Sequence, residues 1–179
     1  ETARQLGMEN YRQLFSPDTE LGRWLATRNT MLRIGRNLFV HAGLSARLLE
    51  RDLEMDTLNA RMSEGLYRTS KERREDPTLE FLYRSAGPVW YRGMVCTDEK
   101  YDPLTPEQTD ALLRRYDADR LLVGHTIFPD ISTFHDGRVI AVNVQNELNR
   151  RKNRGRAVLI EGSRISVVGN RGVKRVLEE

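Results

Sequence analysis

The stretch Leu38-Phe39-Val40-His41-Ala42-Gly43 runs from three consecutive apolar residues directly into a histidine and a glycine. Consecutive apolar residues without alternation are typical of a strand buried on both faces. A second stretch, Leu121-Leu122-Val123-Gly124-His125, repeats this pattern. Ligands of α/β sheets bind outside the carboxyl ends of the strands, so both histidines are candidate site residues. The alternative for each histidine is a partly buried polar residue at the end of a strand, with its hydrogen bonds satisfied and no role in a site.

Helix signals surround the two strands. Thr105-Pro106-Glu107-Gln108 has the pattern of a capping box with proline at the first helical position, and it predicts a helix to about Tyr116. Ser45 is placed to cap a helix from Ala46 to about Arg68. Helices that alternate with strands in this way predict an α/β fold.

The last third of the chain has a different pattern. Ile131–Phe134 and Arg138–Val144 flank the turn Asp136-Gly137, and Ala157–Ile160 and Arg164–Val168 flank a second turn. An Asp-Gly pair between two apolar runs is a strong hairpin signal. We therefore expect antiparallel hairpins in this third.

The composition limits the class of protein. Of the 179 residues, 39% are hydrophobic and 31% charged, which indicates a soluble globular protein and leaves its compartment open, bacterial cytoplasm or periplasm. No apolar run approaches the roughly 18–20 residues of a membrane span. The net charge of +3 is too small to indicate nucleic acid. Cys96 is the single cysteine, which excludes a disulfide framework and a Cys-rich zinc site.

Three motifs together resemble one enzyme family. His41-Ala42-Gly43 is similar to the His-Ala-Gly or His-Gly-Gly motif of calcineurin-like metallophosphoesterases, and Gly124-His125 is similar to their Gly-His motif. Trp90-Tyr91-Arg92-Gly93 resembles a Trp-x-Arg-Gly element of the bacterial, Shewanella-like branch of the phosphoprotein phosphatases. The order of the motifs also fits, from about Phe15 to Val168.

The resemblance implies a four-layer α/β/β/α sandwich and a metal-dependent phosphoester hydrolase. Such enzymes hold two divalent metal ions, here Mn, Fe or Zn, which activate a water for in-line attack on a phosphate ester. It implies that His41 and His125 are metal ligands. It makes Arg92 a candidate phosphate clamp, because a guanidinium group matches phosphate oxygens in a bidentate way. The alternative for Arg92 is a surface arginine stacked on an aromatic neighbour.

Other motifs of that family are absent. Its Asp-x-His, Gly-Asp-x-x-Asp-Arg-Gly and Gly-Asn-His-Glu motifs precede the position of His41 and would lie upstream of Glu1. We therefore expect residues 1–179 to be the C-terminal portion of a single metallophosphatase domain, inactive alone. Half a sandwich exposes sheet surface, so the expected partner is the N-terminal half or a second copy of the chain.

A basic segment lies between the predicted hairpins. Residues 150–156 carry five cationic side chains, and Arg151 and Arg154 are candidate groups for an anionic substrate. No aromatic residues interleave with them, which does not favour nucleic acid. The alternative is a solvated loop.

Two further functions stay open. One is a dinucleoside polyphosphate hydrolase of the same superfamily. The other is a metal-free module that binds an anionic partner. The leading hypothesis is a phosphatase of phosphoproteins or phosphomonoesters.

Overall fold

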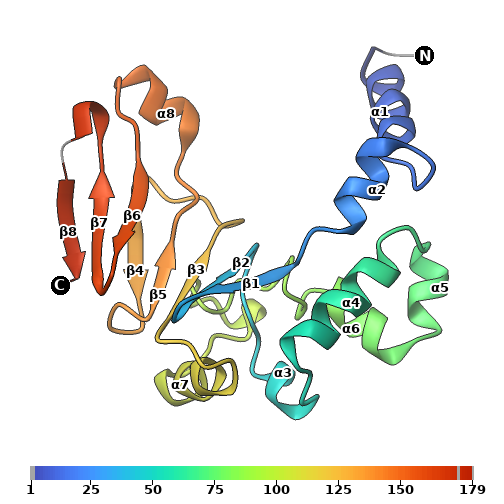
Figure 1. Cartoon of the computed structure of the whole chain (residues 1–179), viewed down its shortest axis with the longest axis horizontal. Helices are drawn as coiled ribbons and strands as arrows, with labels where there is room; N and C mark the ends of the chain where they lie inside the picture. Colours follow the sequence, from blue (N-terminus) through green and yellow to red (C-terminus); the bar gives the residue numbers. More distant parts are fainter. Residues whose placement is uncertain (1–2, 173, 179) are drawn as a thin grey trace.

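The computed structural model describes residues 3–172 and 174–178 and shows a mixed α/β fold (Figure 1). The helices are α1 (Ala3–Leu14), α2 (Glu20–Ala26), α3 (Arg47–Glu50), α4 (Met55–Gly65), α5 (Ser70–Arg74), α6 (Pro77–Tyr83), α7 (Pro106–Arg115) and α8 (Asn146–Arg151), with short 3-10 turns η1 (Glu99–Tyr101) and η2 (Asn170–Gly172). The strands are β1 (Met31–Ile34), β2 (Asn37–Val40), β3 (Arg120–Val123), β4 (Ser132–Phe134), β5 (Val139–Ala141), β6 (Ala157–Glu161), β7 (Arg164–Val168) and β8 (Lys174–Glu178).

Two separate sheets form the centre of the fold. The larger sheet has the order β1-β2-β3-β5-β4, and the smaller sheet has the order β6-β7-β8. β2, β3 and β5 run parallel to one another, whereas β1 and β4 pair antiparallel at the two edges. Both predicted hairpins of the last third are present, as β4–β5 and β6–β7. The carboxyl ends of β2 and β3 therefore lie at the same edge of the large sheet.

One face of the large sheet packs against helices. Leu38 and Val40 of β2 and Leu121 and Val123 of β3 are buried in one cluster with apolar side chains of α3, α4, α6 and α7. Helix α7 begins with the predicted capping box, in which Thr105 and Gln108 bond reciprocally. This face holds the main core, and packing against the helices fixes the positions of β2 and β3.

The opposite face of the large sheet packs against the small sheet. Ile140 of β5 and Leu122 of β3 form a second core with Ile165 and Val167 of β7. The described residues thus give three layers in succession, namely helices, large sheet and small sheet. The α/β class is confirmed, whereas the four-layer sandwich is not confirmed.

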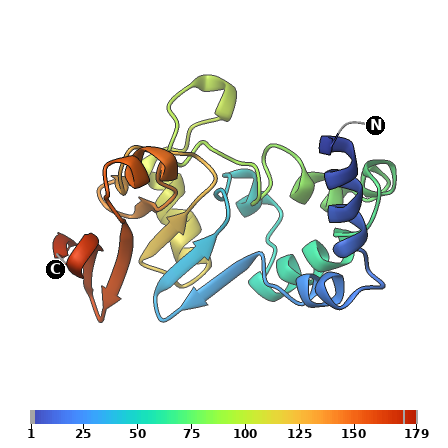
Figure 2. The ribbon, with the colours of Figure 1, turned by 90° about the horizontal axis from the view of Figure 1, so that it is seen from above.

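The small sheet covers only part of that face. The register places Leu32, Phe39, Leu122 and Ile140 in one apolar row across β1, β2, β3 and β5. Their exposure rises along the row, from 1% at Ile140 and 5% at Leu122 to 44% at Leu32. In both views the β1–β2 hairpin lies to one side of the small sheet, which does not extend over it (Figures 1 and 2). The β1 end of the row therefore remains open.

Two predicted segments differ in the structure. The helix expected from Ala46 to about Arg68 is split into α3 and α4 by Asp52, which has a left-handed φ of 45°. The predicted basic loop is in part helical, because α8 continues to Arg151. The sequence also predicts a helix over residues 1–15; α1 (Ala3–Leu14) matches it, and residues 1 and 2 lie outside the described residues. None of the helices in the described ranges combines the length and apolarity needed to cross a membrane.

Candidate active site

The two histidines meet at the carboxyl ends of the parallel strands. His41 directly follows β2, and His125 follows β3 after one glycine. The Nε2 atom of His41 lies 3.2 Å from the Nδ1 atom of His125, and the ring centroids are 5.0 Å apart. The two candidate residues from the strand ends therefore lie in contact at one edge of the large sheet.

The main chain around His125 is held in a tight turn. The amide of Gly124 donates to the carbonyl of His41 over 2.8 Å, and the amide of Thr126 donates to the carbonyl of Gly124 over 2.6 Å. His125, at the centre of this three-residue turn, has a left-handed φ of 60°. The left-handed region is unfavourable for residues other than glycine, and such backbone strain clusters at functional sites. The turn aims the imidazole across the strand end.

A third segment, residues 87–93, docks against both strand ends. The carbonyl of Pro88 accepts hydrogen bonds from the amides of Ala42 at 2.9 Å and Gly43 at 3.4 Å. A Cβ atom at Gly43 would lie 3.1 Å from the carbonyl oxygen of Tyr91, so the glycine permits a close approach of the two segments. This docking brings the motif that contains Arg92 to the histidines.

Arg92 and Trp90 complete the cluster. The guanidinium of Arg92 donates to the hydroxyl of Thr126 over 3.2 Å. Trp90 meets the imidazole of His125 edge-on, with centroids 5.5 Å apart. His41, Trp90, Arg92, His125 and Thr126 thus form one group, called here the histidine cluster. No sequence signal pointed to Thr126, and Trp90 stood out only as part of the Trp-x-Arg-Gly element.

The electrostatics favour an anion at the histidine cluster. Burial lowers the pKa of His125 below its ordinary value, and the nearby Arg92 and His41 lower it further. The Nε2 atom of His125 is buried without a hydrogen-bond partner in the described part of the chain. A neutral ring that carries its proton on this unpartnered nitrogen, beside a guanidinium, has the donor needed to hydrogen-bond an oxyanion.

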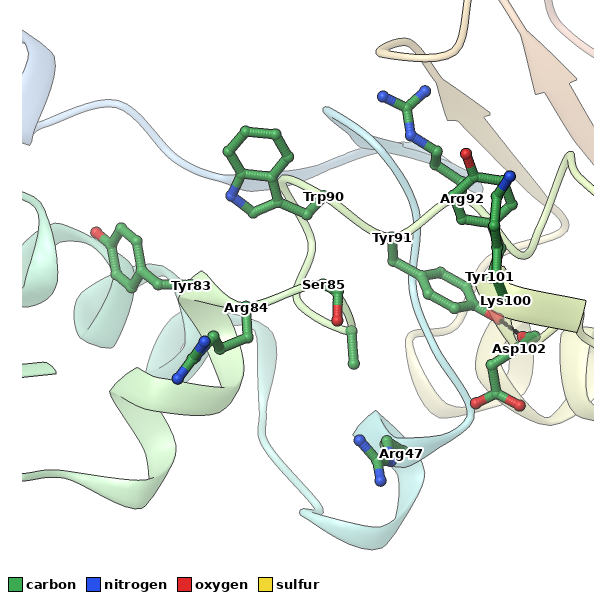
Figure 3. A pocket seen from close by; sticks show the side chains of 11 residues that line it. Arg47, Tyr83, Arg84, Ser85, Trp90, Tyr91, Arg92, Lys100, Tyr101 and Asp102 are labelled. Carbon is green, nitrogen blue, oxygen red and sulfur yellow. Dashed lines mark hydrogen bonds between the residues drawn. The ribbon is translucent and has the colours of Figure 1, made fainter. Parts of the chain in front are cut away.

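Two cavities flank the histidine cluster. One has a volume of about 740 Å³ and is lined by Arg47, Tyr83, Arg84, Ser85, Ala86, Trp90, Tyr91, Arg92, Lys100, Tyr101 and Asp102 (Figure 3). The other has a volume of about 590 Å³, extends along the open apolar row, and includes His41 and Gly124 in its lining. The cluster therefore lies between a basic, aromatic cavity and an apolar groove.

The predicted two-metal centre is wrong for this chain. Among residues 3–172 and 174–178, no group of three or more His, Cys, Asp or Glu side chains could hold a metal ion. The facing ring nitrogens of His41 and His125 are instead in contact with each other. Two imidazoles fall short of the ligand number that divalent transition metals take in proteins.

Arg151 and Arg154 lie apart from the histidine cluster. Arg151 pairs with Glu147 over 2.5 Å, and Arg154 donates to Asn149 over 2.7 Å. Arg154 lines a cavity of about 460 Å³ that contains none of the residues of the cluster. Their proposed contact with substrate stays a prediction. In contrast, no sequence pattern pointed to Arg47, Arg84 or Lys100, which come from three separate segments.

The single cysteine, Cys96, and the third histidine, His135, have structural contacts. Cys96 is half-buried and packs against the main core. His135 lies next to the Asp136-Gly137 turn and is half-buried. Its Nδ1 lies 3.2 Å from the hydroxyl of Thr109, and its Nε2 lies 3.0 Å from the carbonyl oxygen of Met94. Neither side chain lines the two cavities that flank the histidine cluster.

Comparisons with known structures find similar chains among cold-active protein tyrosine phosphatases. A cold-active protein tyrosine phosphatase structure is 29% identical in sequence with a TM-score of 0.82, and the match covers 94% of this chain and 48% of that chain. A point mutant of a cold-active protein tyrosine phosphatase and the cold-active enzyme of a psychrophilic Shewanella species match at 28% identity with TM-scores of 0.81 and the same coverage. The chain spans about half the length of these structures.

These neighbours correct the family expected from the motifs. They are described as protein tyrosine phosphatases, and none is described as a calcineurin-like metallophosphoesterase. No family model and no curated protein matches the chain. The motifs quoted in the sequence analysis are too short to assign the family, and the roles they suggest for His41, Arg92 and His125 stay predictions.

Proposed function

We propose that this chain forms the phosphate-binding half of a phosphatase that acts on phosphate monoesters, phosphotyrosine among them. The observation that carries the proposal is the histidine cluster, which lies at the parallel strand ends of a fold that matches the tyrosine phosphatases over 94% of this chain. In this proposal Arg92 binds two phosphoryl oxygens, and the unpartnered Nε2 of His125 donates a hydrogen bond to a third when the phosphate displaces the groups that cover it.

The proposal assigns further roles within the histidine cluster. His41 holds the ring of His125 in place through the contact of their nitrogens. Trp90 is 54% exposed beside His125 and is placed to pack against the aromatic ring of a phosphotyrosine. The group that attacks phosphorus comes, in this proposal, from the part of the domain that the matched structures have beyond this chain. Residues 1–179 then form the C-terminal portion of one domain and bind without turnover.

The substrate class can be tested by calorimetric titration with phosphotyrosine, phosphoserine and diadenosine tetraphosphate. We expect phosphotyrosine to bind about 2–10-fold more tightly than phosphoserine, because packing on Trp90 adds to phosphate binding. Trp90→Leu is expected to remove this preference and to leave phosphoserine binding in place. A tighter complex with diadenosine tetraphosphate would instead favour a dinucleoside polyphosphate hydrolase. Absence of binding by any phosphate ester would refute the proposal, and sustained phosphate release by this chain alone would refute the half-domain role.

The open apolar row supports a further part of the proposal. A fourth layer, supplied by the rest of the domain, would cover Leu32 and the groove beside it, and a second copy of the chain takes that place when the rest is absent. We therefore expect the isolated chain to self-associate in sedimentation velocity. Leu32→Ser combined with Val142→Ser is expected to weaken that association, because both side chains line the groove. A monomer that melts cooperatively at all concentrations would contradict this expectation.

A further inference from the structure

The cavity beside Trp90 and Arg92 carries a surplus of positive charge. Four of its lining side chains are cationic and one is a carboxylate, that of Asp102. These cations come from separate places in the chain: Arg47 from α3, Arg84 from the end of α6, Arg92 from the docked segment and Lys100 from η1. Four cations that line one cavity create a local field that attracts anions.

Little of this charge is neutralised within the cavity. Arg47 has no ion pair or hydrogen bond from its side chain to any described residue. Arg84 pairs with Glu80 over 3.1 Å and Lys100 with Asp98 over 2.8 Å, but all four of these side chains are well exposed to solvent. Exposed pairs of this kind are weak and exchange readily with another anion. The cavity can therefore accept acidic groups from a ligand.

The same cavity is continuous with the histidine cluster. Trp90 and Arg92 line it and also contact His125 and Thr126. Tyr91 forms a fixed wall, since it is buried and its hydroxyl donates to the main-chain carbonyl of Asp102 (Figure 3). A chain whose phosphorylated side chain occupies the histidine cluster would thus place neighbouring residues in the cavity.

We propose that this cavity binds acidic residues that flank the phosphorylated side chain of a protein substrate. The inference rests on the proposed function and adds a substrate preference to it. A volume of about 740 Å³ suits a few side chains of an extended peptide rather than a single anion. Arg47 and Arg84 are the groups that would read the acidic residues.

The aromatic residues favour a peptide over a single-stranded nucleic acid. Base stacking needs open ring faces on successive aromatic side chains. Arg73 lies 3.8 Å from the ring centroid of Tyr83, and Lys100 lies 4.8 Å from that of Tyr101. With Tyr91 buried as well, Trp90 is the exposed aromatic side chain of the lining. The lining thus presents one ring for stacking and several cations for carboxylates.

The test follows the fluorescence of Trp90 in Trp24→Phe, which leaves one tryptophan because the chain has two. Two phosphotyrosyl peptides are compared, one with glutamate on both sides of the phosphotyrosine and one with alanine there. An unphosphorylated glutamate peptide, free phosphotyrosine and a single-stranded oligonucleotide complete the set. Arg47→Glu with Arg84→Glu removes the proposed contacts. Arg12→Glu with Arg114→Glu is the matched control, since it makes the same charge change at exposed positions outside the cavity.

We expect the acidic phosphopeptide to bind about 10-fold more tightly than the neutral one at low salt. The preference should fall below about 2-fold in the Arg47/Arg84 variant and persist in the control, while free phosphotyrosine binds all three proteins alike. Equal binding of both phosphopeptides, a preference that survives in the Arg47/Arg84 variant, or tighter binding of the oligonucleotide would overturn the inference. If free phosphotyrosine fails to bind, the proposed function fails. In that case the unphosphorylated acidic peptide tests the inference separately. Binding that is lost in the Arg47/Arg84 variant and kept in the control variant supports the inference, and any other result contradicts it.

Discussion

Replacing Arg92 with alanine is expected to weaken the binding of inorganic phosphate by about 10- to 100-fold, measured by calorimetry. The reason is the loss of charge-assisted hydrogen bonds from the guanidinium group, which contribute about 1.5–3 kcal/mol. Arg92→Lys keeps the charge and loses the planar fork, so its affinity should lie between those of the wild type and the alanine variant.

The stability of the Arg92→Ala variant serves as the control. In the described residues the Arg92 guanidinium makes one hydrogen bond, to Thr126, and lies 6.0 Å from the ring centroid of Tyr101. Its removal should therefore change the free energy of unfolding by less than about 1 kcal/mol. A folded Arg92→Ala protein that binds phosphate as tightly as the wild type would exclude Arg92 as the phosphate clamp.

Gly87→Ala is expected to lower the free energy of unfolding by about 2–3 kcal/mol, because the added atom overpacks rigid main chain. A Cβ atom at Gly87 would lie 2.5 Å from the carbonyl carbon of Leu82 and 2.8 Å from the carbonyl oxygen of Phe81. Both belong to the main chain of α6, so relief requires movement of Gly87 and of Pro88 after it. The Pro88 carbonyl accepts from the amides of Ala42 and Gly43, so phosphate affinity should fall as well.

Denaturant unfolding and phosphate titration measure the two effects of Gly87→Ala. The matched control is Gly7→Ala, since Gly7 lies in α1 with no heavy atom within 4 Å of a built Cβ atom. Alanine in an exposed helix should raise stability by roughly 0.5–1 kcal/mol. Equal stability of Gly87→Ala and wild type would show that the docked segment adjusts at no cost and does not position the site.

The sequence was sufficient to place the two histidines. Apolar runs that end in histidine predicted two buried strands of an α/β fold, and ligands of such sheets bind at the carboxyl ends of the strands. The strand register and the 3.2 Å contact of His41 with His125 agree with that reading. The capping box at Thr105 was also reliable, because its two hydrogen bonds are local in sequence.

Features that depend on tertiary packing could not be read from the sequence. The break between α3 and α4 occurs at Asp52, whose left-handed φ is not encoded by a glycine. Arg47, Arg84 and Lys100 line one cavity because three segments pack around it, and none of them stands in a local sequence pattern. The metal centre was expected from a family resemblance on short motifs, and the described residues lack the ligand group it requires.

The most direct test of the central claim is imidazole NMR of the chain during a titration with inorganic phosphate. The chain has three histidines, so each can be followed separately. The proposed site predicts saturable shifts for His41 and His125 and none for His135, whose nitrogens contact Thr109 and Met94 in the fold. Bound phosphate should also raise the lowered pKa of His125, because a nearby anion stabilises the imidazolium form. Unchanged His41 and His125 signals, or equal shifts of all three histidines, would contradict a phosphate site at the histidine cluster.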